Sequence, residues 1–382
     1  MPSFVHPGVL VTQPMLDQIR SNVDRCAEPT RSSFLRAWDG TTPPYGSLPA
    51  VRLGSLAYVP HPQILRADGT GIDEFREDAF AAYTHALLWA ATGDARHVDK
   101  ARSILDGWAR AAPPPPPLSF GLQVAWAGAV WPRAAEIVRH AAGAGPWAGA
   151  AAFGRLLNRV VVPLVDEGAS TNGNIGLVMT EAAAATAVYN DDAALFNASL
   201  ARFRAQAAAY LYVSADGPLP RRPPAQRYLA KTAPVCGPNC SDAELVKYWH
   251  GQAEFDGHDG LSQESCRDLA HAQLGMASLA YVAETAHHQG VDLYAELQPR
   301  LVAGAELHAS LLAWERRPPW LCGGALRAAN ASTFDVVHRH YATRRGVALP
   351  NVSASLRRRG DDRDRCWDQP CWETLTHGDA VS

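Results

Sequence analysis

Apolar residues recur at helical spacing along most of the chain, and the clearest case lies between residues 263 and 288. This segment carries one apolar stripe, formed by Leu269, Ala272, Met276, Leu279 and Ala283. Ser262 stands where an N-cap is expected, and Gly290 stands where the helix should end. Arg267 and His271 are four residues apart and project to the opposite side. That side is either a solvated surface or the wall of an anion-binding cleft.

The same spacing predicts a succession of helices joined by short turns. We expect helices at 73–92, 95–111, 122–142, 147–165, 174–189, 193–212, 263–288 and 291–314. No strand-like alternation interrupts this helix–turn–helix pattern. It predicts an all-α fold, an (α/α) toroid in which antiparallel helix pairs form an incomplete barrel, as one domain over residues 1–382.

Two stretches depart from the helical pattern. Residues 213–262 contain Pro, Gly, Asp and two Cys without helical period, and are too long for a simple connector, so we expect a lid or a binding loop. Residues 350–382 also look irregular, and their charged run RRRGDDRDR is most simply a solvated surface.

Composition excludes several classes of protein. Hydrophobic residues make up 47% of the 382 positions, which allows a large core. The net charge of −3 argues against a general nucleic-acid-binding protein, and no apolar run is long enough for a membrane span. The expected partner is therefore neither nucleic acid nor a membrane, and the sequence leaves the oligomeric state open.

Cysteine usage and glycosylation-type motifs favour an exported protein. Two cysteine pairs are close in sequence, Cys236/Cys240 and Cys366/Cys371, and they look more like disulfides than core thiols. Their spacing does not match a structural zinc site. N-x-S sequons begin at Asn197, Asn239, Asn330 and Asn351. The first residues show no signal peptide. We expect an extracellular or periplasmic protein whose leader is absent from this chain.

The segment STNGNIGLVMTEA begins a helix with an Asn-Gly-Asn turn. Asn172 and Asn174 suit the turn and N-cap of that helix, which is the commonest role for Asn there. The alternative is that an Asn amide at the positive end of the helix donates a hydrogen bond to a carboxylate or a developing enolate.

The segment LQVAWAGAVWPRAAEI places several candidate ligand-binding side chains on one helix. Trp126 and Trp131 are either core residues or sugar-stacking platforms. Arg133 either binds a substrate or pairs with Glu136, and Gln123 lies on or near the same helix.

Two further clusters have competing interpretations. His338, Arg339, His340 and Tyr341 form either a surface turn or the setting of a tyrosine whose pKa is lowered by neighbouring cations. In the long loop, Asp256, His258 and Asp259 offer three acceptors that do not by themselves define a metal geometry. The G-x-S-x-G, P-loop, H-E-x-x-H and G-x-G-x-x-G motifs are absent from the sequence, which removes the usual support for hydrolases and nucleotide-binding proteins of those types.

Taken together, the chain resembles the alginate lyase superfamily. The resembling segments, in order, are HPGVLVT, AAYTHALLWAATGD, LQVAWAGAVWPRAAEI, TNGNIGLVMTEA, YWHGQ, DGLSQESCRDLAHAQLG, QGVDLYAE, LCGG and WETLTHG. The resemblance implies an α/α toroid and a polysaccharide lyase that cleaves a uronic-acid polymer by β-elimination, without a metal or cofactor. An anionic polysaccharide, alginate or glucuronan-like, is then the expected partner.

The resemblance also implies roles for individual residues. Asn174, with Asn172 beside it, would neutralise the substrate carboxylate, and His271 would act as neutraliser or base. Arg267 would hold that carboxylate or lower the pKa of the tyrosine, and Tyr341 would be the base and acid. Substrate binding is expected from Gln123, Trp126, Arg133, Tyr248 and His340.

Two departures bear on these roles. Better-known alginate lyases carry Asn-Asn-His where this chain has Asn-Gly-Asn, so the histidine function is assigned to His271. Relatives often carry a Tyr where this chain has His338, so the catalytic tyrosine is Tyr341 or, as the second choice, Tyr248.

Two rival functions stay open at this point. A toroid glycoside hydrolase needs two carboxylates across the scissile bond, and the available acids are Glu181, Glu264, Asp268 and Glu284. The other rival is a glycan-binding relative that has kept the fold and lost the chemistry.

Overall fold

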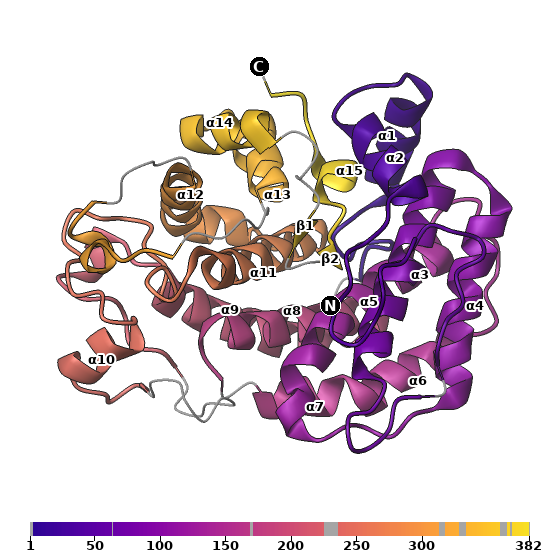
Figure 1. Ribbon diagram of the computed structural model, residues 1–382, viewed down its shortest axis with the longest axis horizontal. Coiled ribbons are helices and arrows are strands. Elements are labelled where there is room, and N and C mark those ends of the chain that lie inside the picture. The colour runs from indigo at the N-terminus through magenta and orange to yellow at the C-terminus, as the bar shows by residue number, and fades with distance from the viewer. Residues whose placement is uncertain are drawn as a thin grey trace.

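The computed structural model consists of helices arranged around a common centre (Figure 1). It describes residues 3–62, 64–168, 171–224, 236–312, 318–327, 334–359, 365–366 and 369–381. The sequon at Asn330 lies outside these ranges. No helix in them combines the length and the apolarity that crossing a membrane requires.

Four long helices form the inner layer, and each packs against the next: α3 (Ile72–Thr92), α5 (Gly121–His140), α8 (Gly173–Tyr189) and α11 (Leu269–His288). Nearly every residue of α3 and α8 is buried on all sides. A helix whose side chains are buried on every side needs neighbours on every side, so α3 and α8 lie inside a ring of other helices.

The outer layer pairs with the inner one and consists of α4 (Ala95–Ala111), α6 (Ala150–Val160), α7 (Val162–Gly168), α9 (Ala193–Tyr210) and α12 (Leu293–Leu311). Helix α4 buries one face only, as an outer helix should. Aspartates at the N-caps of α4, α9 and α12 each accept a backbone hydrogen bond from the first turn, namely Asp94, Asp192 and Asp292. These alternating pairs confirm the predicted toroid.

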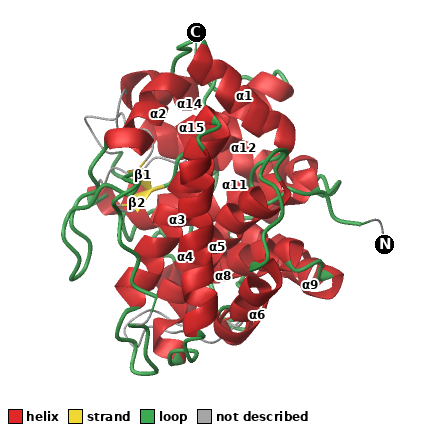
Figure 2. Ribbon diagram, turned by 90° about the vertical axis from the view of Figure 1, so that its right-hand side faces the viewer, coloured by secondary structure: helices red, strands yellow, loops and turns green. Residues whose placement is uncertain are grey.

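Elements from both ends of the chain lie together beside the ring (Figures 1 and 2). They are α1 (Gln13–Asp24), α2 (Thr30–Asp39), α13 (Asp335–His338), the π-helical turn η4 (Arg339–Arg344), α14 (Pro350–Arg359), α15 (Glu373–His377) and a hairpin of β1 (Arg365–Cys366) and β2 (Gln369–Pro370). The irregular structure predicted for 350–382 is therefore corrected, since α14 and α15 occupy much of it.

The segment between α9 and α11 is less irregular than its composition indicates. It contains the 3-10 turn η2 (Ser214–Asp216) and α10 (Asp242–Tyr248). A capping box starts α10: the Ser241 side chain accepts from the Glu244 amide, and the Glu244 carboxylate accepts from the Ser241 amide. The remaining short elements are η1 (Leu118–Phe120) and η3 (Leu321–Gly324).

The predicted helix at 263–288 is wrong at its N-terminal end, because α11 begins at Leu269 and its N-cap is Asp268. Residues 261–263 instead run antiparallel to the end of α9. The Tyr212 amide donates to the Leu261 carbonyl at 2.9 Å, and the Gln263 amide donates to the Tyr210 carbonyl at 2.8 Å. An extended ladder excludes helix there. Arg267 consequently lies in the turn before α11, and not one helical turn below His271.

The helix predicted at 147–165 is also divided, into α6 and α7 at Val161. Pro163 follows the break, and its missing N–H and fixed φ suit the first turn of a new helix.

Candidate active site

A cavity at the centre of the ring is lined by all four inner helices. It encloses about 560 Å³ of space, and its polar and aromatic lining includes Arg76, Trp126, Arg133, Asn174, Glu181 and Tyr281. Three residues singled out in the sequence therefore line the same cavity: Trp126 and Arg133 from α5, and Asn174 from α8.

A buried ion pair forms one wall of this cavity. Arg133 Nη2 donates to Glu181 Oε1 at 2.5 Å, and Ser278 Oγ donates to Glu181 Oε2 at 2.8 Å. The Arg133 guanidinium also lies 4.3 Å from the centre of the Tyr281 ring. Arg133 thus pairs with Glu181 and not with Glu136, and Glu181 has both oxygens engaged. Burial is the largest single influence on the pKa of Arg133 and lowers it. The pairing with Glu181 acts in the opposite direction, and the pKa of Arg133 is raised overall.

A cation held between aromatic rings forms another wall. The Arg76 guanidinium lies 4.1 Å from the Tyr45 ring centre and 4.5 Å from the Trp126 ring centre. Trp131 is fully buried in the core, so of the two tryptophans considered in the sequence only Trp126 lines the cavity. Gln123 is partly exposed on α5 and does not line this cavity.

One buried carboxylate, that of Glu264, joins three segments of the chain: the start of α8, the end of α9 and the turn before α11. Its Oε2 accepts from Asn174 Nδ2 at 2.7 Å, from the Asn174 amide at 3.1 Å and from the Tyr210 hydroxyl at 3.1 Å. Its Oε1 accepts from Arg267 Nη1 at 2.8 Å. Since only 2% of the Glu264 side chain is exposed and 35% of the Arg267 side chain is, Arg267 links this buried centre to the surface.

His271 stands at the start of α11 in a pair with Asp268. Its Nδ1 lies 2.8 Å from each Asp268 carboxylate oxygen, and its amide donates to Asp268 Oδ1 at 2.8 Å. The pKa of Asp268 falls to about 2 because these hydrogen bonds and the nearby positive charges outweigh the effect of burial, which opposes them and is the largest single influence. An ionised carboxylate on Nδ1 fixes the tautomer in which Nδ1 carries the proton and Nε2 has the lone pair.

Tyr210 connects the Glu264 carboxylate with the backbone at the start of α11, where His271 stands. Besides Glu264, its hydroxyl lies 3.3 Å from the His271 carbonyl and 3.2 Å from the Ala272 carbonyl. Burial, followed by the neighbouring charge of Glu264, raises its pKa well above 10, so Tyr210 is a hydrogen-bond donor and not a base. Asn174 and Arg267, which the sequence proposed as partners, therefore meet at Glu264, and His271 is joined to Tyr210 through its backbone carbonyl.

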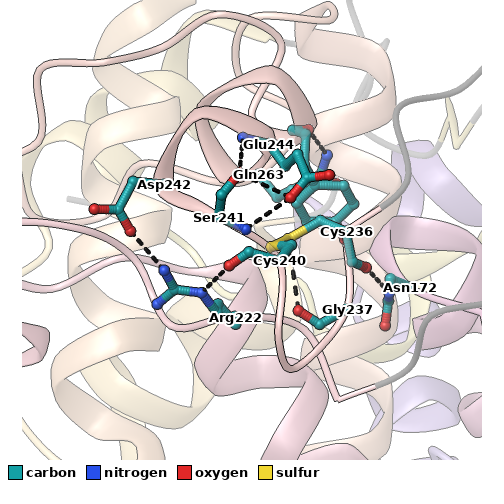
Figure 3. Close-up of a disulfide and its surroundings, with 10 residues drawn as sticks. Asn172, Arg222, Cys236, Gly237, Cys240, Ser241, Asp242, Glu244 and Gln263 are labelled. Atoms are coloured by element: carbon teal, nitrogen blue, oxygen red, sulfur yellow. Dashed lines mark hydrogen bonds and ion pairs between the residues drawn. A yellow bond between two sulfur atoms is a disulfide. The ribbon is translucent and has the colours of Figure 1, made fainter.

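Asn172 and Tyr248 lie next to this centre. Together with Tyr210 they line a smaller pocket of about 180 Å³. Asn172 Nδ2 donates to the Cys236 carbonyl at 3.3 Å, so this amide holds the segment after α9 (Figure 3). Asn172 is also the N-cap position of α8, without a side-chain capping bond.

Disulfides bracket this region. Cys236 and Cys240 are joined, as the sequence predicted, and lie beside Asn172 and Gln263 (Figure 3). A second disulfide, which the sequence did not predict, joins Cys266 to Cys322 and so holds the turn between Glu264 and Arg267. Cys371 is also disulfide-bonded. The predicted pairing of Cys371 with Cys366 falls on a side chain outside the described ones.

The structure does not bring Tyr341 to this centre. Tyr341 is 1% exposed, lies in η4, and donates from its hydroxyl to the Tyr294 carbonyl at 2.8 Å. His340 stacks on Tyr294 at 3.6 Å between ring centres, and His338 is buried too. Burial raises the pKa of Tyr341 instead of lowering it, so the surface-turn interpretation and the activated-tyrosine interpretation both fail to describe it. None of the three lines a described pocket.

Potential metal ligands gather elsewhere. Donor atoms of His6, Glu136 and His140 lie within 4.8 Å of one another. However, the two imidazole rings stack at 4.3 Å, and lone pairs that lie in parallel ring planes do not converge on one ion. His6 instead bridges Glu136 and Asp191 at 3.0 Å each, and ties the N-terminal segment to α5. Asp259 accepts from Ser214, and His258 stacks on Trp320.

Comparison with known proteins concerns the fold. No protein-family model and no curated protein matches the sequence. Among solved structures, alginate lyase A1-III from Sphingomonas species A1 is similar over 91% of this chain and 93% of its own, at 17% identity and a TM-score of 0.56. A histidine-to-alanine variant of that lyase, complexed with a tetrasaccharide, gives 18% identity over 90% and 91% of the chains, at a TM-score of 0.57.

An alginate lyase from Bacteroides ovatus is similar over 97% of this chain and 99% of its own, at 12% identity and a TM-score of 0.54. The class that the fold defines is thus a helical toroid. More particularly, this chain has the toroid fold of alginate lyases.

Sequence reasoning missed Glu264 as the centre of the site, and also missed Tyr210 and Arg76. Glu264 stands three residues before Arg267, and Asp268 three residues before His271, so pairing at this spacing was a usable signal. Tyr210 gave no such signal, because its role depends on packing.

Proposed function

We propose that this protein is a polysaccharide lyase that cleaves a uronic-acid polymer, alginate or a glucuronan-like chain, by metal-independent β-elimination. The observation that carries the proposal is that Asn174 and Arg267 both donate to one buried carboxylate, that of Glu264, and that the Asp268–His271 pair stands at the start of the helix that follows it. The shared fold with alginate lyases adds support.

The chemistry defines what such a site must supply. Elimination breaks the C5–H bond and the C4–O bond of a uronate, forms a C4=C5 double bond, and transfers a proton to the departing oxygen. The carbon acid is weak because the adjacent carboxylate is already negative. A site therefore needs hydrogen-bond donors for the carboxylate, a base for the C5 proton, and an acid for the leaving oxygen.

His271 is the proposed base. With Asp268 on Nδ1, Nε2 carries the lone pair that would accept the C5 proton, and the resulting imidazolium would be stabilised by the same carboxylate. The protonated imidazole can then return that proton to the departing C4 oxygen on the same side of the sugar.

Asn174 and Arg267 are the proposed donors to the substrate carboxylate. Each makes one side-chain hydrogen bond to Glu264, which orients the group while other N–H bonds of the amide and guanidinium remain to be used. Asn174 lines the central cavity, which is where a sugar ring would be held against Trp126 and Tyr281.

Of the two tyrosines considered in the sequence, Tyr248 is the one that lines a pocket, beside Asn172 and Tyr210. We propose that Tyr248 binds substrate, and that Tyr341 and His340 have a structural role. Arg133 and Trp126 keep their proposed roles as cavity walls, whereas Gln123 has no contact that supports one.

The hydrolase alternative finds less support. Of the carboxylates in the described chain, Glu181 alone lines the central cavity, and its oxygens are taken by Arg133 and Ser278. A hydrolase requires two carboxylates that face the scissile bond. The disulfides also suit an exported enzyme, because such bonds persist in oxidising compartments.

The experiment that tests this proposal is ultraviolet absorbance during incubation with alginate blocks, glucuronan and pectate. Elimination creates a conjugated unsaturated uronate, so absorbance should grow on one of these polymers. New reducing ends without absorbance would establish hydrolysis instead, and binding without either product would identify a glycan-binding protein.

A further inference from the structure

A second hollow is lined by Arg267, which donates to Glu264, and the charged residues in its described lining are cations. The hollow is an open one of about 1010 Å³, and the described residues that line it are Ala243, Val246, Lys247, His250, Gly251, Cys266, Arg267 and Arg327. None of these eight residues is acidic. We refer to this hollow, defined by these eight residues, as the basic groove.

The cations of the basic groove come from three separate stretches of chain. Lys247 ends α10, Arg267 lies in the turn before α11, and Arg327 follows η3. Lys247 and Arg327 are exposed, and in the described part of the chain neither side chain pairs with a carboxylate. Arg267 is paired with Glu264, so the two exposed cations Lys247 and Arg327 supply the positive potential by which the groove would favour anions.

Cross-links hold the groove in place. The Cys266–Cys322 disulfide joins the turn that carries Arg267 to η3. The Leu269 amide donates to the Arg327 carbonyl at 3.0 Å, which ties Arg327 to the start of α11. The groove is therefore a fixed surface next to the candidate catalytic centre, and does not require its cations to be gathered by the ligand.

Glu264 connects the groove with the cavity. Asn174 lines the cavity, Arg267 lines the groove, and both donate to the same Glu264 carboxylate, at 2.7 and 2.8 Å. A ligand held by both residues must consequently extend from one hollow to the other. A polyuronate suits this arrangement, because every sugar along the chain carries a carboxylate.

We propose that the basic groove binds carboxylates of the polyuronate chain beyond the reacting sugar, so that the preferred substrate is an extended anionic chain and not a short oligosaccharide. This inference rests on the proposed lyase function. Lys247 and Arg327 are the specificity-determining residues, while Arg267 belongs to both hollows.

The test compares chain lengths in a Lys247→Ala/Arg327→Ala double variant. For the polymer that the enzyme cleaves, KM and the calorimetric Kd should rise about tenfold or more at low salt. For a uronate trimer of the same sugar, the rise should be at most about twofold. The difference should shrink in high salt, because exposed charges are screened there. A double variant Lys247→Arg/Arg327→Lys keeps the charges and should restore polymer affinity.

Arg155→Ala provides the matched control, since Arg155 is an exposed cation on α6 outside both hollows. Equal losses on trimer and polymer, or no loss on either, would refute the groove while leaving elimination intact. Conversely, groove-dependent binding of alginate or glucuronan without any unsaturated product would support the groove and reject the lyase function.

Discussion

At the scale of single residues, the account depends on Glu264. A buried carboxylate is stable only where hydrogen bonds and an opposite charge compensate for lost hydration, and Glu264 receives both. Its Oε2 accepts hydrogen bonds from Asn174 and Tyr210, and its Oε1 accepts one from Arg267. The site therefore depends on one side chain that need not touch the substrate.

A Glu264→Gln substitution should expose this positioning role. Gln offers one carbonyl oxygen in place of two, so it can accept from Asn174 or from Arg267 but not from both. We expect kcat to fall about 10- to 100-fold with a smaller change in KM, because a misplaced donor fails mainly in the transition state. Elimination kinetics followed by absorbance measure both parameters.

Glu254→Gln is the control for this substitution, because Glu254 is an exposed carboxylate on the same stretch of chain. An unchanged kcat in Glu264→Gln, with Tm lowered, would show that Glu264 stabilises the fold without positioning the site.

The sequence predicted part of this residue-scale picture. Arg267, His271 and Asn174 stood out because their types and local setting suit anion binding. Tyr341 stood out because neighbouring cations could lower its pKa, yet packing buries it against Tyr294. Local sequence shows which side chains could react, but their convergence depends on contacts between positions 90 residues apart, such as Asn174 and Glu264.

At the scale of elements, α3 shows how an inner helix accommodates charge. The hydroxyl oxygen of Tyr58 lies 2.5 Å from Asp78 Oδ1 and 3.2 Å from Glu77 Oε1. That hydroxyl has one proton, which the Asp78 contact uses, so Glu77 is best bonded when it is itself protonated. Burial, as the largest influence, raises the pKa of Glu77 to about 7.

This shift predicts a pH dependence of stability. Because the folded pKa of Glu77 lies above its ordinary value of 4.5, its contribution to stability is complete below that value and is lost as pH rises through about 7. Glu77→Gln imitates the protonated form. The variant should therefore unfold at a higher Tm than the wild type at pH 8, with little difference at pH 5.

Thermal unfolding at the two pH values measures this effect, and Glu74→Gln, at a partly exposed position in the first turns of α3, is the control. A Glu77→Gln variant that is less stable than the wild type at pH 8 would contradict the protonated state assigned to Glu77.

Element boundaries show where periodicity fails. The start of α11 was misplaced because 263–268 continues the apolar and polar spacing of a helix, whereas pairing of 261–263 with the end of α9 keeps the chain extended. Long-range pairing overrode local propensity there. The capping box of α10 was readable as Ser241 followed three residues later by Glu244, and was overlooked among the prolines and glycines.

At the scale of the whole molecule, the toroid follows from alternating buried and amphipathic helices. This alternation could be predicted, since fully apolar helices need partners on all sides and short turns make neighbours antiparallel. The placement of the terminal elements beside the ring could not, because α1 and α2 pack against α15 from the other end of the chain, and no local pattern indicates that pairing. The ring gives the site its form, with the central cavity lined by Asn174 and the basic groove lined by Arg267, both of which donate to Glu264.

The central claim is that His271 is the base of the elimination, in a site whose donors Glu264 positions, and that Tyr341 takes no part in the reaction. Its most direct measurement is the rate of unsaturated product formation on the cleaved polyuronate by His271→Ala and Tyr341→Phe variants. We expect kcat to fall at least about 100-fold in His271→Ala, as for loss of a general base, and to stay within about twofold in Tyr341→Phe. The reverse pattern, with Tyr341→Phe inactive and His271→Ala active, would contradict the account.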